Sequence, residues 1–168
     1  MLGRPDGVEA KLLGEFGDTA DGVGGRAGAV VRQDHTEVHG ARLTAARVAR
    51  LATTDPDGRP HLVPIVFALE GETLYSAVDR KPKRSSKLRR IENARVRPDV
   101  TILVDHYEED WGRLWWIRLR GHARVLDQGE ERERALMLLS DKYPQYRSEP
   151  PRGPVLAVDV TEVREWAS

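Results

Sequence analysis

The feature of this sequence best suited to chemistry is a basic run between positions 80 and 93. Seven cations fall in this one segment of a chain whose formal net charge is zero: Arg80, Lys81, Lys83, Arg84, Lys87, Arg89 and Arg90. Pro82 suits the first turn of a helix, and Ser85 can cap a slightly later start. A helix N-terminus among clustered cations favours a phosphate group. The alternative is a helix whose basic face is only solvated.

The usual catalytic side chains are sparse. The chain has no cysteine, which excludes thiolate nucleophiles, thiolate metal sites and disulfides. The available serines lack a nucleophile elbow, and no metal site is predicted. The histidines at 61, 106 and 122 fall on three different predicted strands, where each can be structural. A phosphate site without a nucleophile favours a protein that positions a cofactor, which then carries the reaction.

Length and charge limit the possible classes of protein. The 168 residues suffice for one domain. A chain with no net charge is not typical of a nucleic-acid binder, and no aromatic residue lies inside the basic run to stack on a base. No apolar run is long enough to cross a membrane, and the N-terminus lacks a secretory pattern. We therefore expect a cytoplasmic protein.

Residues 1–40 differ from the remainder in composition. They hold nine of the 15 glycines, with four basic against seven acidic residues. Such a segment buries little apolar surface, so we expect a mobile extension or a start-site artefact. Residues 41–168 are then the cofactor-binding domain.

Six strands and two helices are predicted within that domain. The strands are expected at 48–54, 60–69, 73–77, 100–107, 113–126 and 155–163, and the helices in the basic run and at 130–143. The turn at Asp55–Gly58 and the short turn at Glu70–Glu72 predict that the first three strands form an antiparallel meander. The element order indicates a small closed barrel with helical plugs.

Two of these strands have informative faces. The second is apolar on both sides, which predicts a barrel interior on one side and a partner subunit or ligand on the other. Pro64 places that strand at an edge, at a bulge or beside a ligand; a plain edge strand is the simpler alternative. The fifth strand alternates between a core face and a basic face that carries Trp116, Arg118, Arg120 and Arg124, which is either solvated or a binding face.

From about Leu43 to Trp166 the chain resembles the pyridoxamine 5′-phosphate oxidase-like split-barrel superfamily. It is most similar to the actinobacterial deazaflavin-dependent oxidoreductases, which use coenzyme F-420. The matching segments are Arg47–Thr53, Asp57–Pro64, Leu74–Asp79, Lys81–Lys83, Leu103–Tyr107, Trp111, Arg113–Trp116 and Lys142–Tyr146. The resemblance implies a mainly β (α+β) fold, an FMN-binding-type split β-barrel of about six antiparallel strands with two or more helices.

The resemblance also implies a homodimer with two cofactor sites at the subunit interface and a small-molecule substrate. The backbone of Val63, Pro64 and Ile65 is expected along the tricyclic ring. The cofactor phosphate is expected at Ser76, Ala77, Lys81, Lys83, Arg84 and Ser85, with Lys87 extending the cationic surface. Trp116 or Arg118 is the expected aromatic or basic contact from the fifth strand, which in such proteins often comes from the other subunit.

F-420 carries a polyglutamate tail, so the long basic surface favours it, and FMN is the alternative cofactor. The implied reaction passes a hydride from ring carbon 5 to an electron-poor organic substrate. The proton is expected from solvent, Tyr107 or His61. The other possible role is a non-catalytic protein of the same fold that binds a flavin, haem or a lipid-like ligand.

Overall fold

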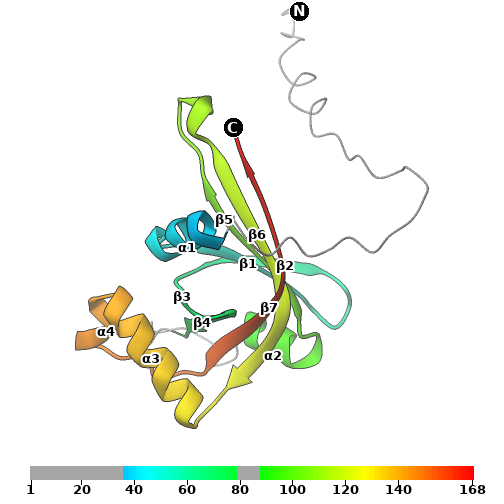
Figure 1. Cartoon of the computed structure of the whole chain (residues 1–168). Coiled ribbons are helices and arrows are strands. Elements are labelled where there is room, and N and C mark those ends of the chain that lie inside the picture. The colour runs from blue at the N-terminus through cyan, green and yellow to red at the C-terminus, as the bar shows by residue number, and fades with distance from the viewer. Residues whose placement is uncertain (1–35, 79–87) are drawn as a thin grey trace, which may run out of the picture. The chain divides into compact units, whose positions relative to one another are not determined.

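The fold is an antiparallel sheet of seven strands with helices packed against it (Figure 1). The computed structural model describes residues 36–78 and 88–168, with side chains from residue 40 onward. The helices are α1 (Thr36–Ala45), α2 (Arg89–Val96), the 3-10 turn η1 (Trp111–Arg113), α3 (Glu130–Lys142) and α4 (Gln145–Ser148). The strands are β1 (Ala49–Thr54), β2 (Pro60–Ile65), β3 (Ala68–Glu70), β4 (Thr73–Ala77), β5 (Asp99–His106), β6 (Trp115–Leu126) and β7 (Val155–Ala167).

The strands lie in the order β2-β1-β5-β6-β7-β4-β3, and every neighbouring pair is antiparallel. The predicted mainly β (α+β) class is confirmed. The two antiparallel pairings predicted for the first three strands are observed, but the middle strand of that predicted meander is not continuous. The expected strand at 60–69 is broken at Val66–Phe67, so that β2 pairs with β1 while β3 pairs with β4. One apolar run therefore supplies both edges of the sheet.

Tyr143, just after α3, occupies the break between β2 and β3. The Phe67 amide donates to the Tyr143 hydroxyl at 3.1 Å. The same hydroxyl lies 2.9 Å from the carbonyl oxygens of Phe67 and Arg47, and its single proton can serve one of them at a time. Phe67 is fully buried, so its backbone groups need such partners where no strand supplies them.

Two hydrophobic clusters lie on the two faces of the sheet. The larger combines the inner residues of β1, β5 and β6 with Leu43 of α1 and with Ile91 and Ala94 of α2. The smaller places α3, through Ala135 and Leu139, against β4 and β7. Near α2, the Asn93 amide donates to the Thr53 hydroxyl at 3.0 Å, and both residues are buried. The buried polar pair is thus satisfied within the larger cluster.

The alternation predicted for the fifth strand is confirmed in β6. Ile117, Leu119, Gly121 and Ala123 are buried, whereas the intervening residues are exposed or half-buried. A bulge follows Arg120, where β7 comes unusually close. A Cβ atom on Gly121 would lie 2.3 Å from the Asp159 carbonyl oxygen, so this position requires glycine.

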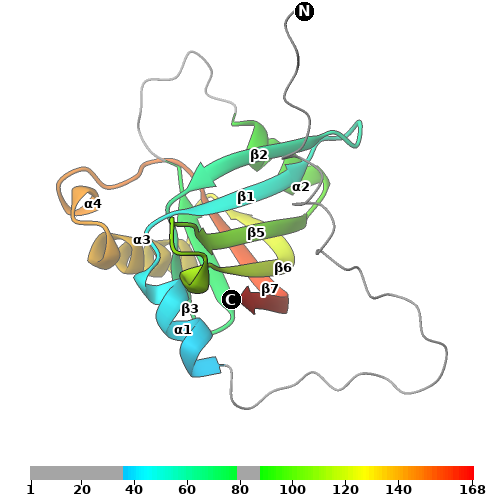
Figure 2. The ribbon, with the colours of Figure 1, turned by 90° about the horizontal axis from the view of Figure 1, so that it is seen from above.

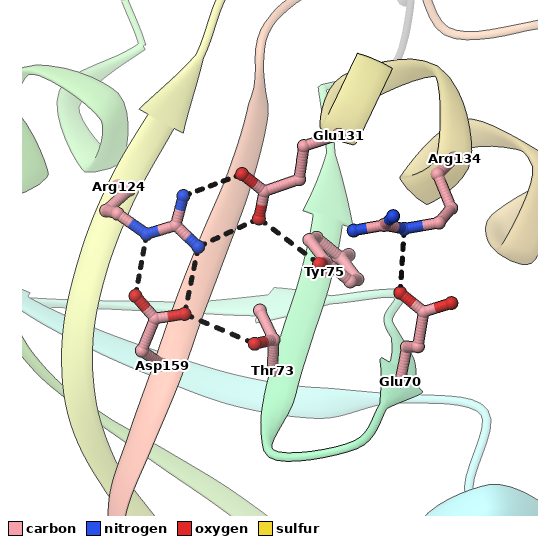
Figure 3. A network of polar contacts seen from close by, with 7 residues as sticks. All are labelled: Glu70, Thr73, Tyr75, Arg124, Glu131, Arg134 and Asp159. Atoms are coloured by element: carbon pink, nitrogen blue, oxygen red, sulfur yellow. Dashed lines mark hydrogen bonds and ion pairs between the residues drawn. The ribbon is translucent and has the colours of Figure 1, made fainter. Parts of the chain in front are cut away.

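A polar clamp joins β6, β7 and α3 (Figure 3). The Arg124 guanidinium makes two contacts of 2.6 and 2.9 Å with Asp159 and two of 2.8 Å with Glu131. Thr73 donates to Asp159 and Tyr75 donates to Glu131, each at 3.2 Å, which brings β4 into the network. Hydrogen bonds from Arg124 hold the pKa of both carboxyls below their ordinary values.

The helices differ from prediction in their bounds. α2 begins at Arg89 after Leu88 in an extended conformation, so neither Pro82 nor Ser85 begins this helix. α4 lies between α3 and β7, where no helix was predicted. α1 crosses the predicted domain boundary at 40/41, and residues 1–35 lie outside the described part of the chain. None of the described helices combines the length and apolar character needed to span a membrane.

Replacing Tyr143 by Phe removes the hydroxyl but keeps the ring. We expect the free energy of unfolding to fall by about 1–3 kcal/mol, because the Phe67 amide loses its partner in a buried position. Urea denaturation followed by circular dichroism measures this. Tyr107→Phe is the matched control, since that ring is 64% exposed, and it should change stability little. Equal effects of the two changes would contradict the role given to Tyr143.

The Arg124 clamp predicts a pH-dependent contribution to stability. Both carboxyl pKa values are lowered on folding, so the stabilisation is complete above their ordinary values of 4.5 and 3.8. It is lost progressively as pH falls below those values and through the lowered pKa values of the folded state. We expect Arg124→Gln to lower the free energy of unfolding by about 1 kcal/mol near neutral pH. The Arg124 side chain is 43% exposed, so solvent screening limits the strength of each ion pair. Denaturation titrations should show this difference shrinking in acid; a pH-independent difference would contradict the clamp.

Candidate functional site

Three of the predicted site residues, Pro64, Trp116 and Arg118, lie on one face of the sheet. Strand register aligns Pro64 of β2, Arg50 of β1, Leu103 of β5 and Arg118 of β6 in one row. Directly paired residues point to the same side of a sheet, so these side chains share a face. We call it the outer face. Figure 2 shows β2, β1, β5, β6 and β7 following one another across it.

β2 forms the edge of the outer face. Its Leu62 is 66% exposed and its Pro64 is exposed, whereas Val63 is half-buried and Ile65 is buried against the core. Of the alternatives predicted for Pro64, the edge position is the one observed. Proline supplies no backbone donor there, and the neighbouring leucine offers an unpartnered apolar surface. This edge can accept a flat apolar group or another protein surface.

Besides Arg124 of the clamp, four arginines project from the outer face, and three of these four have carboxylate partners. Arg50 pairs with Asp105, while Arg120 and Arg164 both contact Glu162. A hydrogen bond from Arg164 lowers the pKa of Glu162, and the charges of Arg120 and Arg118 add to this. Among the described side chains, Arg118 has no carboxylate within ion-pair distance. Its guanidinium lies 5.9 Å from the centre of the Trp116 ring.

Arg118 is half-buried between β5 and β7. A half-buried guanidinium without a carboxylate partner is suited to an external anion, because it has already lost part of its hydration. The structure thus brings Trp116 and Arg118 together, and register places Arg118 in the same row as Pro64.

β7 adds residues to this face that the sequence reasoning did not include. The strand was expected to end at Val163 but continues to Ala167, so that Arg164 lies opposite Arg118 and Trp166 opposite Trp116. Trp166 is 42% exposed and enlarges the aromatic part of the face. The signal was present in the sequence, because Glu162, Arg164 and Trp166 continue the strand period of two.

Of the residues predicted to hold the cofactor phosphate, the structure describes only Ser76 and Ala77. The side chains of Ser76 and Ala77 are buried on β4: Ser76 pairs with Leu156 of the larger cluster, and Ala77 belongs to the cluster under α3. Any contact from these two residues must come from their backbone. Lys81, Lys83, Arg84, Ser85 and Lys87 lie outside the described residues, and their assignment stays a prediction.

The two candidate proton donors are not brought together. His61 pairs with Thr53 on β2, toward the end of β1 that meets α2. Tyr107 follows the opposite end of β5 and is 64% exposed. Within one chain, the two residues therefore lie toward different ends of the strands.

The described side chains offer no metal centre: within residues 36–78 and 88–168, His, Asp and Glu never gather in threes as ligands. What the outer face can do is orient a planar, anionic molecule between an edge strand and a guanidinium.

Comparison with known proteins agrees with this architecture. Residues 36–167 match the model of a protein family described as pyridoxamine 5′-phosphate oxidase. No curated protein matches the sequence. The folds resembling this one include a conserved hypothetical protein of Mycobacterium tuberculosis, at 18% identity over 85% of this chain and 90% of that one, with a TM-score of 0.65.

Two further structural neighbours have described ligands. A FAD-binding protein of Mesorhizobium loti is 23% identical over 79% of this chain and 94% of its own, with a TM-score of 0.58. A haem storage protein of Vibrio cholerae is 15% identical over 78% and 92%, with a TM-score of 0.61. At these identities the likeness establishes the split-barrel fold alone.

Proposed function

Because the chain belongs to the pyridoxamine 5′-phosphate oxidase family, we propose that it is an oxidoreductase that uses coenzyme F-420 at the interface of a homodimer. Its substrate is a small, electron-poor organic molecule. The observation that carries the proposal is Arg118: a half-buried guanidinium without a described carboxylate partner, aligned with the exposed edge at Pro64. An anionic cofactor with a flat ring satisfies both features.

The residues divide the work of binding. Pro64 and its neighbours Val63 and Ile65 hold the ring along β2, and Arg118 with Trp116 meets an anionic or aromatic part of the cofactor. The cations at 81–87 hold the phosphate and extend toward an acidic tail. When bound, the deazaflavin supplies a hydride from ring carbon 5. The protein orients the ring, excludes water and leaves the proton to solvent, Tyr107 or His61.

FMN is the alternative cofactor, since it has the same requirement for a flat surface and a phosphate site. The FAD-binding neighbour supports a flavin in this fold. The haem storage neighbour supports a second candidate function, in which the same fold holds a ligand without turnover. The scarcity of acid–base side chains on the outer face is compatible with that role.

Fluorescence titration of the purified chain with oxidised F-420 tests the proposal. We expect binding at micromolar cofactor. Arg118→Ala should weaken it about tenfold, as expected for one charge-assisted hydrogen bond of about 1.5 kcal/mol. Arg120→Ala is the matched control, because Arg120 lies two residues away on the same strand face but already contacts Glu162, and it should bind nearly as tightly as the unaltered protein.

The same titration separates the parts of the basic run. Lys83→Ala should weaken binding well beyond Arg89→Ala; equal effects would contradict the assignment of Lys83 to the phosphate. Binding of FMN in place of F-420 would establish the flavin alternative. Multiple-turnover reduction of an acceptor by reduced F-420, abolished by Lys83→Ala, would rule out ligand storage as the sole role.

The homodimer has its own test. We propose that the outer face contacts a second copy of the chain, because the large apolar side chain of Leu62 is 66% exposed there. Leu62→Asp should convert the dimer to a monomer in light scattering, since a carboxylate would be desolvated at the interface. Met137→Asp on α3 is the matched control, with a side chain 62% exposed, and should leave the dimer intact. A monomeric unaltered protein would contradict the interface.

A further inference from the structure

A hollow lies between α1 and the turn that joins β5 to β6. It measures about 380 Å³ and is lined by Arg42, His106, Gly112, Arg113 and Trp115. That volume lies within the range of pockets that bind small molecules. Arg42 comes from the last turn of α1, and the other residues come from the ends of the two strands and from η1.

This hollow is separate from the outer face. Trp115 and Trp116 are adjacent on β6, so their side chains point to opposite sides of the sheet. Trp115 packs against the larger hydrophobic cluster, whereas Trp116 shares the outer face with Arg118. A molecule in the hollow would therefore not compete with one on the outer face.

Aromatic rings fix one wall of the hollow. The Trp115 and His106 rings are nearly parallel, with 19° between their planes and 6.1 Å between their centres. The Arg42 guanidinium lies 5.1 Å from the centre of the Trp115 ring, so a cation–π contact holds it over this wall. Among the described side chains, Arg42 has no carboxylate partner.

Arg113 supplies the second guanidinium. Its Nε lies 3.0 Å from Glu108 Oε1, and the other oxygen of Glu108 lies 3.2 Å from His106 Nε2. Glu108 thus lies within ion-pair distance of both residues, and no partner is described for the terminal Nη groups of Arg113. A Cβ at Gly112 would lie 3.2 Å from Asp110 Oδ1, so a larger residue there would crowd that carboxylate. Two guanidiniums and an imidazole line the hollow, and no carboxylate does.

The surrounding charges limit what the hollow can accept. Glu108, Glu109 and Asp110 follow one another on the same turn, and their charges oppose the approach of a polyanion. A single carboxylate is compact enough to reach the guanidiniums, which match its planar geometry with paired N–H donors. The stacked rings favour a planar group beside it.

We propose that this hollow binds a small planar carboxylic acid, with its carboxylate on Arg42 and Arg113 and its ring beside Trp115. The site acts independently of the cofactor assigned to the outer face. Its ligand is an aromatic or conjugated monoacid rather than a nucleotide or a polyphosphate.

The test uses the full chain without added cofactor. Benzoate, neutral benzamide and inorganic phosphate are titrated separately while the Trp115 indole N–H is followed by NMR, its signal being assigned with Trp115→Phe. We expect benzoate to shift this signal saturably. Benzamide and phosphate should bind at least about tenfold more weakly, the ratio expected for one lost charge-assisted contact.

Variants identify the contacts. Arg113→Ala should weaken benzoate binding about tenfold, and Arg113→Lys should weaken it less, because the charge remains but the paired donors are lost. Arg120→Ala is the matched control. Arg120 also pairs with a glutamate, Glu162, but it lies on the outer face of β6, on the other side of the sheet from Trp115. Equal binding of benzoate and benzamide, equal binding of benzoate and phosphate, or equal effects of Arg113→Ala and Arg120→Ala would each overturn the proposal.

Discussion

The hydroxyl of Tyr143 is the contact on which this fold depends most. A run of apolar residues must leave one edge of the sheet after Ile65 and begin the other edge at Ala68. The two residues between them have no strand partner, and Phe67 is fully buried. Tyr143 accepts from the Phe67 amide and donates to a neighbouring carbonyl, which satisfies the backbone where the sheet cannot. Lys142 covers the same point, with its Nζ 4.1 Å from the centre of the Phe67 ring.

The break has a functional consequence. It frees β2 to stand at an edge next to β1, which exposes Leu62 and Pro64 and aligns them with the arginines of β1 and β6. The residues that hold the fold are therefore distinct from those proposed to hold a ligand, and the two sets can be altered separately.

Local patterns predicted much of the fold. β4 was predicted at its observed bounds, and the alternation of β6 identified both of its faces, because strand period and turn residues are encoded locally. The break at Val66–Phe67 was missed because its cause, Tyr143, lies 76 residues away. On the site, Trp116 and Arg118 could be chosen from one strand, but the partners of the other three arginines depend on register between distant strands. The hollow at Trp115 is formed by α1 together with the β5–β6 hairpin, so no single segment of the sequence predicts it.

The most direct test of the account is a crystal structure of the full chain with oxidised F-420 bound. The account predicts a homodimer in which the ring lies along Val63–Ile65 on the outer face, the phosphate meets Lys81 and Lys83, and Arg118 contacts the cofactor. A cofactor bound away from β2, or bound to a monomer with Arg118 still open to solvent, would contradict it.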